Sequence, residues 1–249
     1  MLDILEVRYT EEETKAKRAQ VAELFTAKSN HVKNSDITAI CNHDLELLFA
    51  CYDQVFFANW FKECFAGTLQ FSFSRRMTKS AGKTYYPKDA DPARPESLVI
   101  KVKINIDMIL AYGLVENSDR VGGITTRSRL EALQVVLEHE LVHVIEFIHF
   151  QQSSCSKKRF RALANHLFGH TESFHCLPTS QQIARHKLGL TLGERVAFPM
   201  KGQVVEGLLY AVHKRAVVMV PDRQGDYADQ RGQRYTKYYV PLSLLRKSF

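Results

Sequence analysis

The sequence predicts an α+β protein in which a mixed core of helices and strands is followed by a small all-β barrel. Three observations predict this class. Residues 130–147 form an apolar run with helical periodicity that contains the pattern His-Glu-x-x-His. Two earlier segments, 69–74 and 99–106, alternate apolar and polar residues as strands do. From residue 190 onward, short strand-like segments are separated by turn residues, as in small barrels.

The chain begins with a predicted polar helix at residues 11–27, followed by a polar stretch. We expect residues 1–40 to be a helical extension that is loosely attached to the core, because its charge run is typical of a solvated face. Residues 43–65 are rich in apolar and aromatic side chains, with a spacing that suits one or two buried helices. The folded core is therefore expected to begin in this second segment.

Between the two predicted strands the sequence favours irregular structure. Residues 79–83 are typical of a turn, and residues 87–95 form a polar, proline-containing loop. After the second strand we expect a short helix at 106–114 and a loop at 116–126. The His-Glu-x-x-His helix would follow this loop directly.

The most informative residues are His139, Glu140 and His143. On a helix, positions i and i+4 lie on the same face, so the two imidazoles can bind one Zn²⁺ and Glu140 can act on a bound water as general base. The surrounding run is almost entirely apolar, which predicts a buried helix. Two histidines and a glutamate buried together need a partner such as a metal ion. The sequence therefore predicts a zinc site with Glu140 as the catalytic base.

A catalytic zinc site needs a third protein ligand and one open position for water. Residues 157–168 have a helical pattern that ends at Gly169, and an antiparallel return would bring the later half of this helix level with the two histidines. His170, just past its end, is the predicted third metal ligand. Cys155, just before the helix, and His166, on it, are the alternatives that the sequence leaves open.

Composition restricts the class of protein further. The 249 residues are 45% hydrophobic and 24% charged, which is ordinary for a soluble globular protein. No apolar run reaches the length of a membrane span, and the N-terminus lacks the pattern of a secretory signal, so we expect no membrane partner. The five cysteines are scattered and form no Cys-x-x-Cys pair. This usage indicates a reduced, intracellular protein of the cytoplasm or a nucleus.

Several motifs occur in an order that resembles a known family. They are Leu48–Phe57, Phe73–Gly82, Ile100–Ile106 and Leu137–His143. Over about residues 43–176 the chain is similar to the SprT-like (Spartan-type) metalloprotease domain. The resemblance implies a zincin-type mixed core and a zinc-dependent endopeptidase that acts on DNA-associated or DNA-crosslinked proteins, as in DNA repair. By the same resemblance, His139 and His143 are zinc ligands and Glu140 is the catalytic base.

The chain departs from this family at the third zinc ligand. The family usually places a His-Gly pair a few residues before an aromatic residue at the start of the second helix. Here Phe160 takes the place of the aromatic residue, Ser156 occupies the aligned position, and Cys155 lies beside it. Either the ligand has moved to His170 or Cys155, or zinc binding is impaired. In the last case the protein would be a DNA- or chromatin-binding module with a structural or degenerate zincin site.

The C-terminal segment, residues 189–249, is expected to be a separate small barrel similar to SH3-like or KOW-like folds, so that the metalloprotease domain spans residues 41–188. It replaces the Cys-rich zinc ribbon that often follows that domain. The chain carries a net charge of +7, and basic residues in this segment are interleaved with tyrosines. Basic groups track phosphates and aromatic faces stack on bases, so the pattern favours DNA binding. The predicted DNA-contacting residues are Lys214, Arg215, Arg231, Arg234 and Lys237.

Overall fold

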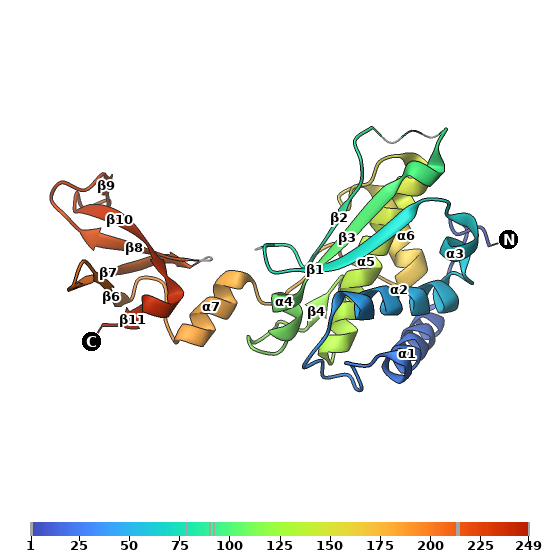
Figure 1. Ribbon diagram of the computed structural model, residues 1–249, viewed down its shortest axis with the longest axis horizontal. Coiled ribbons are helices and arrows are strands. Elements are labelled where there is room, and N and C mark those ends of the chain that lie inside the picture. The colour runs from blue at the N-terminus through green and yellow to red at the C-terminus, as the bar shows by residue number, and fades with distance from the viewer. Residues whose placement is uncertain (1, 78, 90, 92, 213–214, 249) are drawn as a thin grey trace. The chain divides into compact units, whose positions relative to one another are not determined.

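The chain folds as two compact units, Met1–Leu177 and Pro178–Phe249 (Figure 1). A computed structural model describes residues 2–77, 79–89, 91, 93–212 and 215–248. It confirms an α+β chain that ends in an antiparallel sheet. The boundary between the units follows residue 177, whereas we had expected it after residue 188. The helix that occupies this interval belongs to the second unit.

The N-terminal helix α1 (Glu11–Lys28) belongs to unit 1 and is not a loosely attached extension, which corrects the expectation for residues 1–40. Its first turn is fixed by a capping box, in which Thr10 and Glu13 each accept the other's backbone N–H through their side chains. Its thin apolar face packs against α2 (Asn42–Phe56), and Phe25 is fully buried there. A narrow apolar stripe is therefore sufficient to anchor the helix.

The sheet of unit 1 has the strand order β1-β3-β2. Strand β1 (Thr68–Ser74) pairs in parallel with β3 (Val99–Asn105), and β2 (Gly82–Tyr85) pairs antiparallel with β3. The strands at 68–74 and 99–105 confirm the alternation seen in the sequence. Strand β2 was missed, because its first two residues fall in the expected turn at 79–83 and its four residues are too few to show a period.

The helix that carries the His-Glu-x-x-His pattern is α5 (Arg129–Phe150), and it packs against β2 and β3 of the sheet (Figure 1). It begins at Ser128, whose side chain accepts the N–H of Glu131. The other elements of unit 1 are α3 (Trp60–Cys64), a 3₁₀ turn (Pro95–Ser97), α4 (Ile106–Leu110), β4 (Arg120–Val121), β5 (Ile124–Thr125) and α6 (Lys158–Phe168). Strands β4 and β5 form a short hairpin inside the predicted loop at 116–126.

An aromatic cluster fills the core of unit 1 where α2 and α6 meet. Tyr52 and Phe56 of α2, Phe57 just after it, and Phe168 of α6 are at most 1% exposed. Their rings contact one another with centroid separations of 5.1 to 6.3 Å, mostly tilted or edge-to-face. This packing accounts for the aromatic content of residues 43–65 and fixes α6 beside α5.

Unit 2 consists of one helix and one antiparallel sheet. Helix α7 (Ser180–Leu188) precedes the strands and ends before residue 189, where we had expected the all-β segment to begin. The strands are β6 (Arg195–Met200), β7 (Gln203–Val212), β8 (Arg215–Pro221), β9 (Tyr227–Ala228), β10 (Arg234–Pro241) and β11 (Arg246–Lys247), with a 3₁₀ turn at Leu242–Leu244. Their order is β11-β6-β7-β8-β10-β9, and across the described residues no strand pairing joins the two ends into a closed barrel.

The two faces of the unit 2 sheet differ in burial. One face packs around Val196, Leu209, Val218 and Val240, which are at most 3% exposed. The opposite face leaves large aromatic side chains in solvent. Within the part of the chain that the structure describes, no helix is long and apolar enough to cross a membrane.

Candidate metal centre

Three side chains in unit 1 can surround one metal ion. His139 and His143 lie one turn apart on α5, with ring centroids 5.0 Å apart. Cys155, from the loop between α5 and α6, joins them, and one ligand atom from each residue lies within 4.8 Å of the other two. Ligands of a tetrahedral zinc site are about 3.3 to 3.6 Å apart for ordinary Zn–N and Zn–S bonds. Small changes in side-chain conformation would therefore bring the three ligand atoms to the distances of a zinc site.

The proton of His143 is assigned by its neighbours. The Nδ1 atom of His143 lies 2.7 Å from the hydroxyl oxygen of Ser153, and that hydroxyl lies 2.6 Å from Oε2 of Glu146. Since a carboxylate only accepts, Ser153 donates its proton to Glu146 and accepts the Nδ1–H of His143. The Nε2 atom of His143 is then left with a lone pair for a metal ion.

Glu146 holds the loop that carries Cys155. Besides Ser153, this fully buried carboxylate accepts the N–H of Ser154 at 3.0 Å and Nε–H of Arg159 at 2.8 Å. It thus joins the end of α5, the loop and the start of α6. Sequence reasoning missed this support, although a glutamate three residues after His143 on a helix lies on the same face.

Burial keeps both histidines neutral. It lowers the pKa of His139 to about 3, with further lowering by the charges of His143, His170 and His175. It lowers the pKa of His143 to about 4, against an opposing effect of Glu146. Neutral imidazoles are the form that binds metal ions, so the site is ready for a cation at pH 7.

Glu140 lies beside β2, where it is 4% exposed. Its Oε2 atom accepts the hydroxyl proton of Thr84 at 2.7 Å, and a β-carbon at Gly82 would collide with its carboxylate. Burial raises the pKa of Glu140 to about 7, although the Thr84 hydrogen bond lowers it. A divalent cation nearby would favour the ionised form. The carboxylate is therefore suited to exchange protons near neutral pH.

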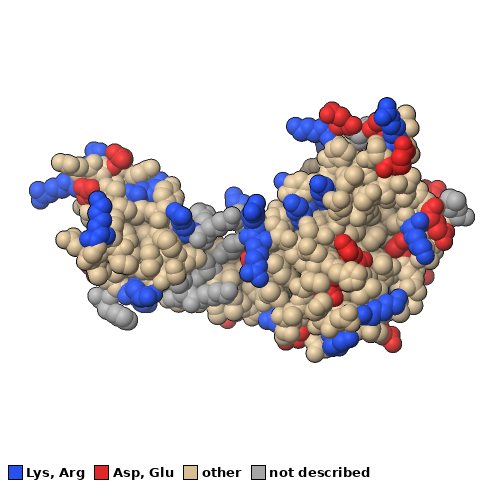
Figure 2. Space-filling view, in the orientation of Figure 1, with Lys and Arg blue, Asp and Glu red and all other residues tan. Residues whose placement is uncertain are grey.

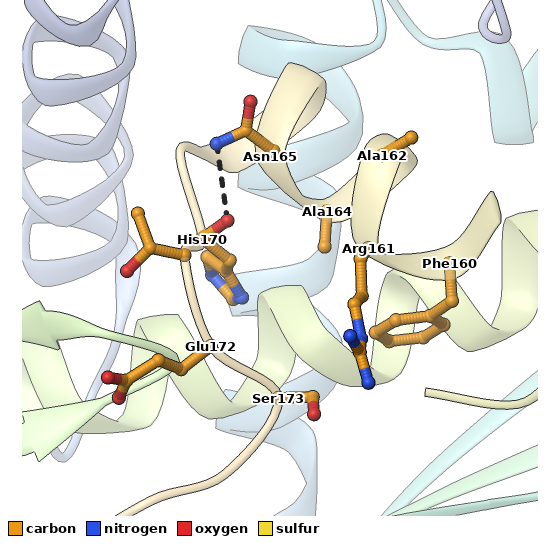
Figure 3. Close-up of a pocket in the computed structure, with 9 residues that line it drawn as sticks. Phe160, Arg161, Ala162, Ala164, Asn165, His170, Glu172 and Ser173 are labelled. Atoms are coloured by element: carbon orange, nitrogen blue, oxygen red, sulfur yellow. Dashed lines mark hydrogen bonds between the residues drawn. The ribbon is translucent and has the colours of Figure 1, made fainter. Parts of the chain in front are cut away.

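Phe160 forms an apolar wall against the two histidines. Its ring centroid is 4.9 Å from that of His139 and 4.4 Å from that of His143. The same residue lines a pocket of about 400 Å³ between α6 and the segment that follows it (Figure 3). The other lining residues are Arg161, Ala162, Ala164, Asn165, His170, Thr171, Glu172 and Ser173. This pocket adjoins the histidines through Phe160 and contains neither Glu140 nor Cys155.

His170, our predicted third ligand, is not brought to the histidine pair. Its Nε2 atom lies 2.9 Å from Oε2 of Glu138, which also accepts hydrogen bonds from Arg18 at 2.8 Å and from the Tyr52 hydroxyl at 2.7 Å. Burial alone would raise the pKa of Glu138, but Arg18 and His170 lower it to about 2. A fully buried carboxylate needs such donors. His170 therefore serves Glu138, and Cys155 takes the position we had assigned to it.

The other histidines near the site have separate roles. His166 lies on α6 outside the cluster, and its backbone carbonyl accepts the N–H of Tyr9. His175 accepts the N–H of Ala81 through Nε2 at 3.1 Å, one residue from the glycine that contacts Glu140. Its Nδ1 atom is buried without a hydrogen-bond partner among the described residues. His175 is thus a polar group at the border of the site.

In a second group, His31, Cys41 and Asp44, one ligand atom from each residue also lies within 4.8 Å of the other two. Its carboxylate is already engaged at the start of α2. Asp44 accepts the hydroxyl proton of Ser29 at 2.6 Å and the N–H of Cys41 at 2.8 Å, and it lies 2.9 Å from Nδ1 of His31. These contacts are those of a helix cap, so this cluster has a structural explanation.

Three of the predicted DNA-contacting residues, Arg215, Arg234 and Lys237, lie on the strands of unit 2. Arg215 is exposed at the start of β8, and Arg231 is exposed between β9 and β10. Arg234 donates from Nε to the carbonyl of Gly225 at 2.8 Å, and Nζ of Lys237 lies 3.8 Å from the ring centroid of Tyr227. Lys214 lies outside the described residues.

Comparison of the chain with known protein families, with curated proteins and with solved structures gives no match. The class of site therefore follows from its geometry alone: a candidate His₂Cys metal centre beside a buried glutamate, in an α+β unit.

Proposed function

We propose that the protein is a zinc-dependent endopeptidase. The observation that carries the proposal is the group of His139, His143 and Cys155, with Glu140 next to the first of them on the same helix. Two neutral nitrogen donors and one sulfur donor suit Zn²⁺, and three protein ligands leave one position open for water. This donor set supports a catalytic zinc site rather than a closed structural one.

The chemistry requires a polarised carbonyl and an activated water. Zinc, when bound, supplies both by acting as a Lewis acid and lowering the pKa of the water. Glu140 accepts the proton of the attacking water and returns it to the amine that leaves. Thr84 orients the Glu140 carboxylate, and Ser153 with Glu146 holds His143 in the tautomer that leaves Nε2 free.

The sheet favours an extended peptide as the substrate. Strand β2 pairs with β3 on one side, and among the described residues no strand pairs with its other side. An extended peptide can add to such an edge through main-chain hydrogen bonds. Because Gly82 of β2 contacts the Glu140 carboxylate, a peptide in that position would pass the proposed base.

We also propose that the substrates are proteins bound or crosslinked to DNA. The sequence resemblance to SprT-like domains supports this, and so does the distribution of charge. Unit 2 carries 12 of the 34 lysines and arginines but only 5 of the 27 acidic residues, so it holds the whole net charge of +7. Basic side chains are spread over its visible face, with few acidic ones (Figure 2). Such a charge favours a polyanionic partner.

The test is the Glu140→Gln variant, which preserves the size of the side chain and removes its basicity. We expect unchanged zinc content by elemental analysis, and loss of cleavage of an unfolded protein substrate and of self-cleavage. Glu12→Gln, at an exposed position of α1, is the matched control and should cleave normally.

Two results would contradict the proposal. Undiminished proteolysis by Glu140→Gln would remove the mechanism. A purified chain that binds DNA but contains no zinc and cleaves nothing would instead identify a DNA- or chromatin-binding module. The departure at Ser156 from the SprT-like pattern is the observation that favours this second candidate.

A further inference from the structure

The outer face of the unit 2 sheet carries aromatic side chains where a solvent-facing sheet is usually polar. Strand pairing places Leu208, Met219 and Lys237 in one row across β7, β8 and β10. Tyr239 pairs with Val217 two residues further along, on the same face, and Tyr227 of β9 pairs with Tyr235 of β10. We call Tyr210, Tyr227, Tyr239 and Lys237 the tyrosine face.

The three tyrosines are exposed although they lie near one another. Tyr210 is 65% exposed, Tyr239 63% and Tyr227 43%. A hollow of about 630 Å³ extends along this side of the sheet, lined by Leu208, Tyr210, Met219, Tyr227, Tyr235 and Lys237. Exposed apolar surface of this kind marks a binding site on a folded protein. The exposed rings favour a ligand with flat groups that can stack on them.

Lys237 lies among the rings and sets the charge of the ligand. Its ammonium lies 3.8 Å from the centroid of the Tyr227 ring. Its pKa is raised, first by the hydrogen bond with the Tyr227 side chain and then by the nearby Tyr239 and Tyr210. A cation already covers the Tyr227 ring, so a second cation such as a methylated lysine is disfavoured there. An anionic ligand is favoured instead.

The acidic residue beside the hollow does not change this conclusion. Asp229 accepts the backbone N–H groups of Arg231 and Gln233 through Oδ1, and the Tyr235 hydroxyl through Oδ2. Its carboxylate therefore stabilises the turn between β9 and β10. With the net charge of +7 in unit 2, the surroundings of the hollow attract a polyanion.

We propose that the tyrosine face binds single-stranded DNA, with bases stacked on Tyr210 and Tyr239 and a phosphate at Lys237, whose ammonium covers the Tyr227 ring. The bases of a duplex are stacked on one another, whereas those of a single strand are free to stack on aromatic side chains. Strands β7 and β9 are separated by three interstrand spacings, about 14 Å, which gives room for more than one nucleotide. The proposal rests on the DNA part of the proposed function and is independent of the peptidase chemistry.

The test measures binding of the full chain to a labelled oligothymidylate of about 15 nucleotides by fluorescence anisotropy, within the site sizes known for such proteins. The double variant Tyr210→Ala/Tyr239→Ala should bind at least about tenfold more weakly, since each stacked ring contributes about fivefold or more. The corresponding Tyr→Phe double variant keeps both rings and should bind normally. Val204→Ala, which alters another exposed residue of β7, is the control for folding and should also bind normally.

The charge of Lys237 is tested by salt dependence. Lys237→Ala should lower the slope of log K against log salt concentration by about 0.7, the value for one single-strand phosphate contact. Lys247→Ala removes the same charge from β11 and is the matched control, which should leave the slope nearly unchanged.

Two results with the variants would overturn the proposal: wild-type affinity in the Tyr→Ala double variant, or an equal loss of affinity in Val204→Ala. Two results with other ligands would also overturn it. One is tighter binding of a blunt duplex or of oligouridylate than of the oligothymidylate, and the other is binding of a proline-rich peptide by a chain that has no affinity for the oligonucleotide. Binding is measured without proteolysis and can be repeated in Glu140→Gln. Its failure is therefore distinct from failure of the proposed peptidase.

Discussion

The two units of the chain treat charged and aromatic side chains in opposite ways. Unit 1 buries the carboxyl groups of Glu138 and Glu146 and packs most of its phenylalanines in the core. Unit 2 exposes Tyr210, Tyr227 and Tyr239 and carries the whole net charge of the protein. Buried, fully partnered charges hold neighbouring side chains in fixed positions, as catalysis requires. Exposed rings and cations instead suit a long, flexible ligand.

Two neighbouring residues of α5 show how unit 1 separates support from chemistry. Glu138 is satisfied by Arg18, Tyr52 and His170. The next residue, His139, lies about 100° around the helix and faces Phe160, His143 and Cys155. One side of this turn of helix thus fixes α5 to α1 and α2, and the adjacent side presents the metal ligands.

The largest expected effect is loss of the metal. Removing a residue that only hydrogen-bonds to a metal ligand typically weakens metal binding about 10- to 100-fold. Cys155→Ala removes a ligand itself, so it should reduce zinc affinity by more than this and should abolish proteolysis. His170→Ala should lower stability and leave the zinc stoichiometry at one. Competition with a chromophoric chelator measures the affinity of both variants. If His170→Ala lost zinc and Cys155→Ala kept it, the assignment of the third ligand would be reversed.

The buried ion pair of Arg18 and Glu138 should have the next largest effect. Arg18→Ala leaves the carboxylate buried with fewer donors, and we expect a loss of about 3 to 5 kcal/mol in the free energy of unfolding. Denaturant unfolding followed by circular dichroism measures it. Lys15→Ala, which removes an exposed ion pair with Glu11 on the same helix, should have no measurable effect. Equal stability of the two variants would show that α1 is only loosely attached after all.

A smaller effect on zinc affinity is expected at Ser153, which hydrogen-bonds to the metal ligand His143. Ser153→Ala removes the acceptor of the His143 Nδ1 proton and one donor to Glu146, and it should weaken zinc binding about 10- to 100-fold. Ser156→Ala, three residues along the same loop, removes a hydroxyl that contacts Ser154 at 2.9 Å rather than His143 or Glu146, and is the matched control. If zinc affinity fell equally in both variants, loop flexibility rather than the hydrogen-bond relay would be responsible.

The features predictable from the sequence were local. The helix at 129–150 and its paired histidines follow from periodicity and an i, i+4 spacing, both of which are set within one element. The strands at 68–74 and 99–105 follow from alternation over seven residues each. In contrast, β2 has four residues, too few for a period to be distinguished from a turn.

The features that could not be predicted depend on distant partners. Arg18 resembles any solvated residue of a polar helix, yet its partner Glu138 lies 120 residues away. His170 was a reasonable ligand by sequence position, but Glu138, 32 residues before it, engages its Nε2 atom. Cys155 reaches the histidines because Glu146 fixes its loop, and that contact is visible only in three dimensions.

The smallest expected effect concerns the stability of unit 2. Tyr210→Ala should change its free energy of unfolding by less than about 0.5 kcal/mol, because the ring is 65% exposed and is not part of the core. Thermal unfolding of the full chain followed by circular dichroism, compared with Val204→Ala, measures this. The same substitution should weaken binding of single-stranded DNA, so stability and binding would separate. A large loss of stability would instead mean that the ring packs against the sheet, and the contrast between the enclosed site of unit 1 and the open face of unit 2 would no longer hold.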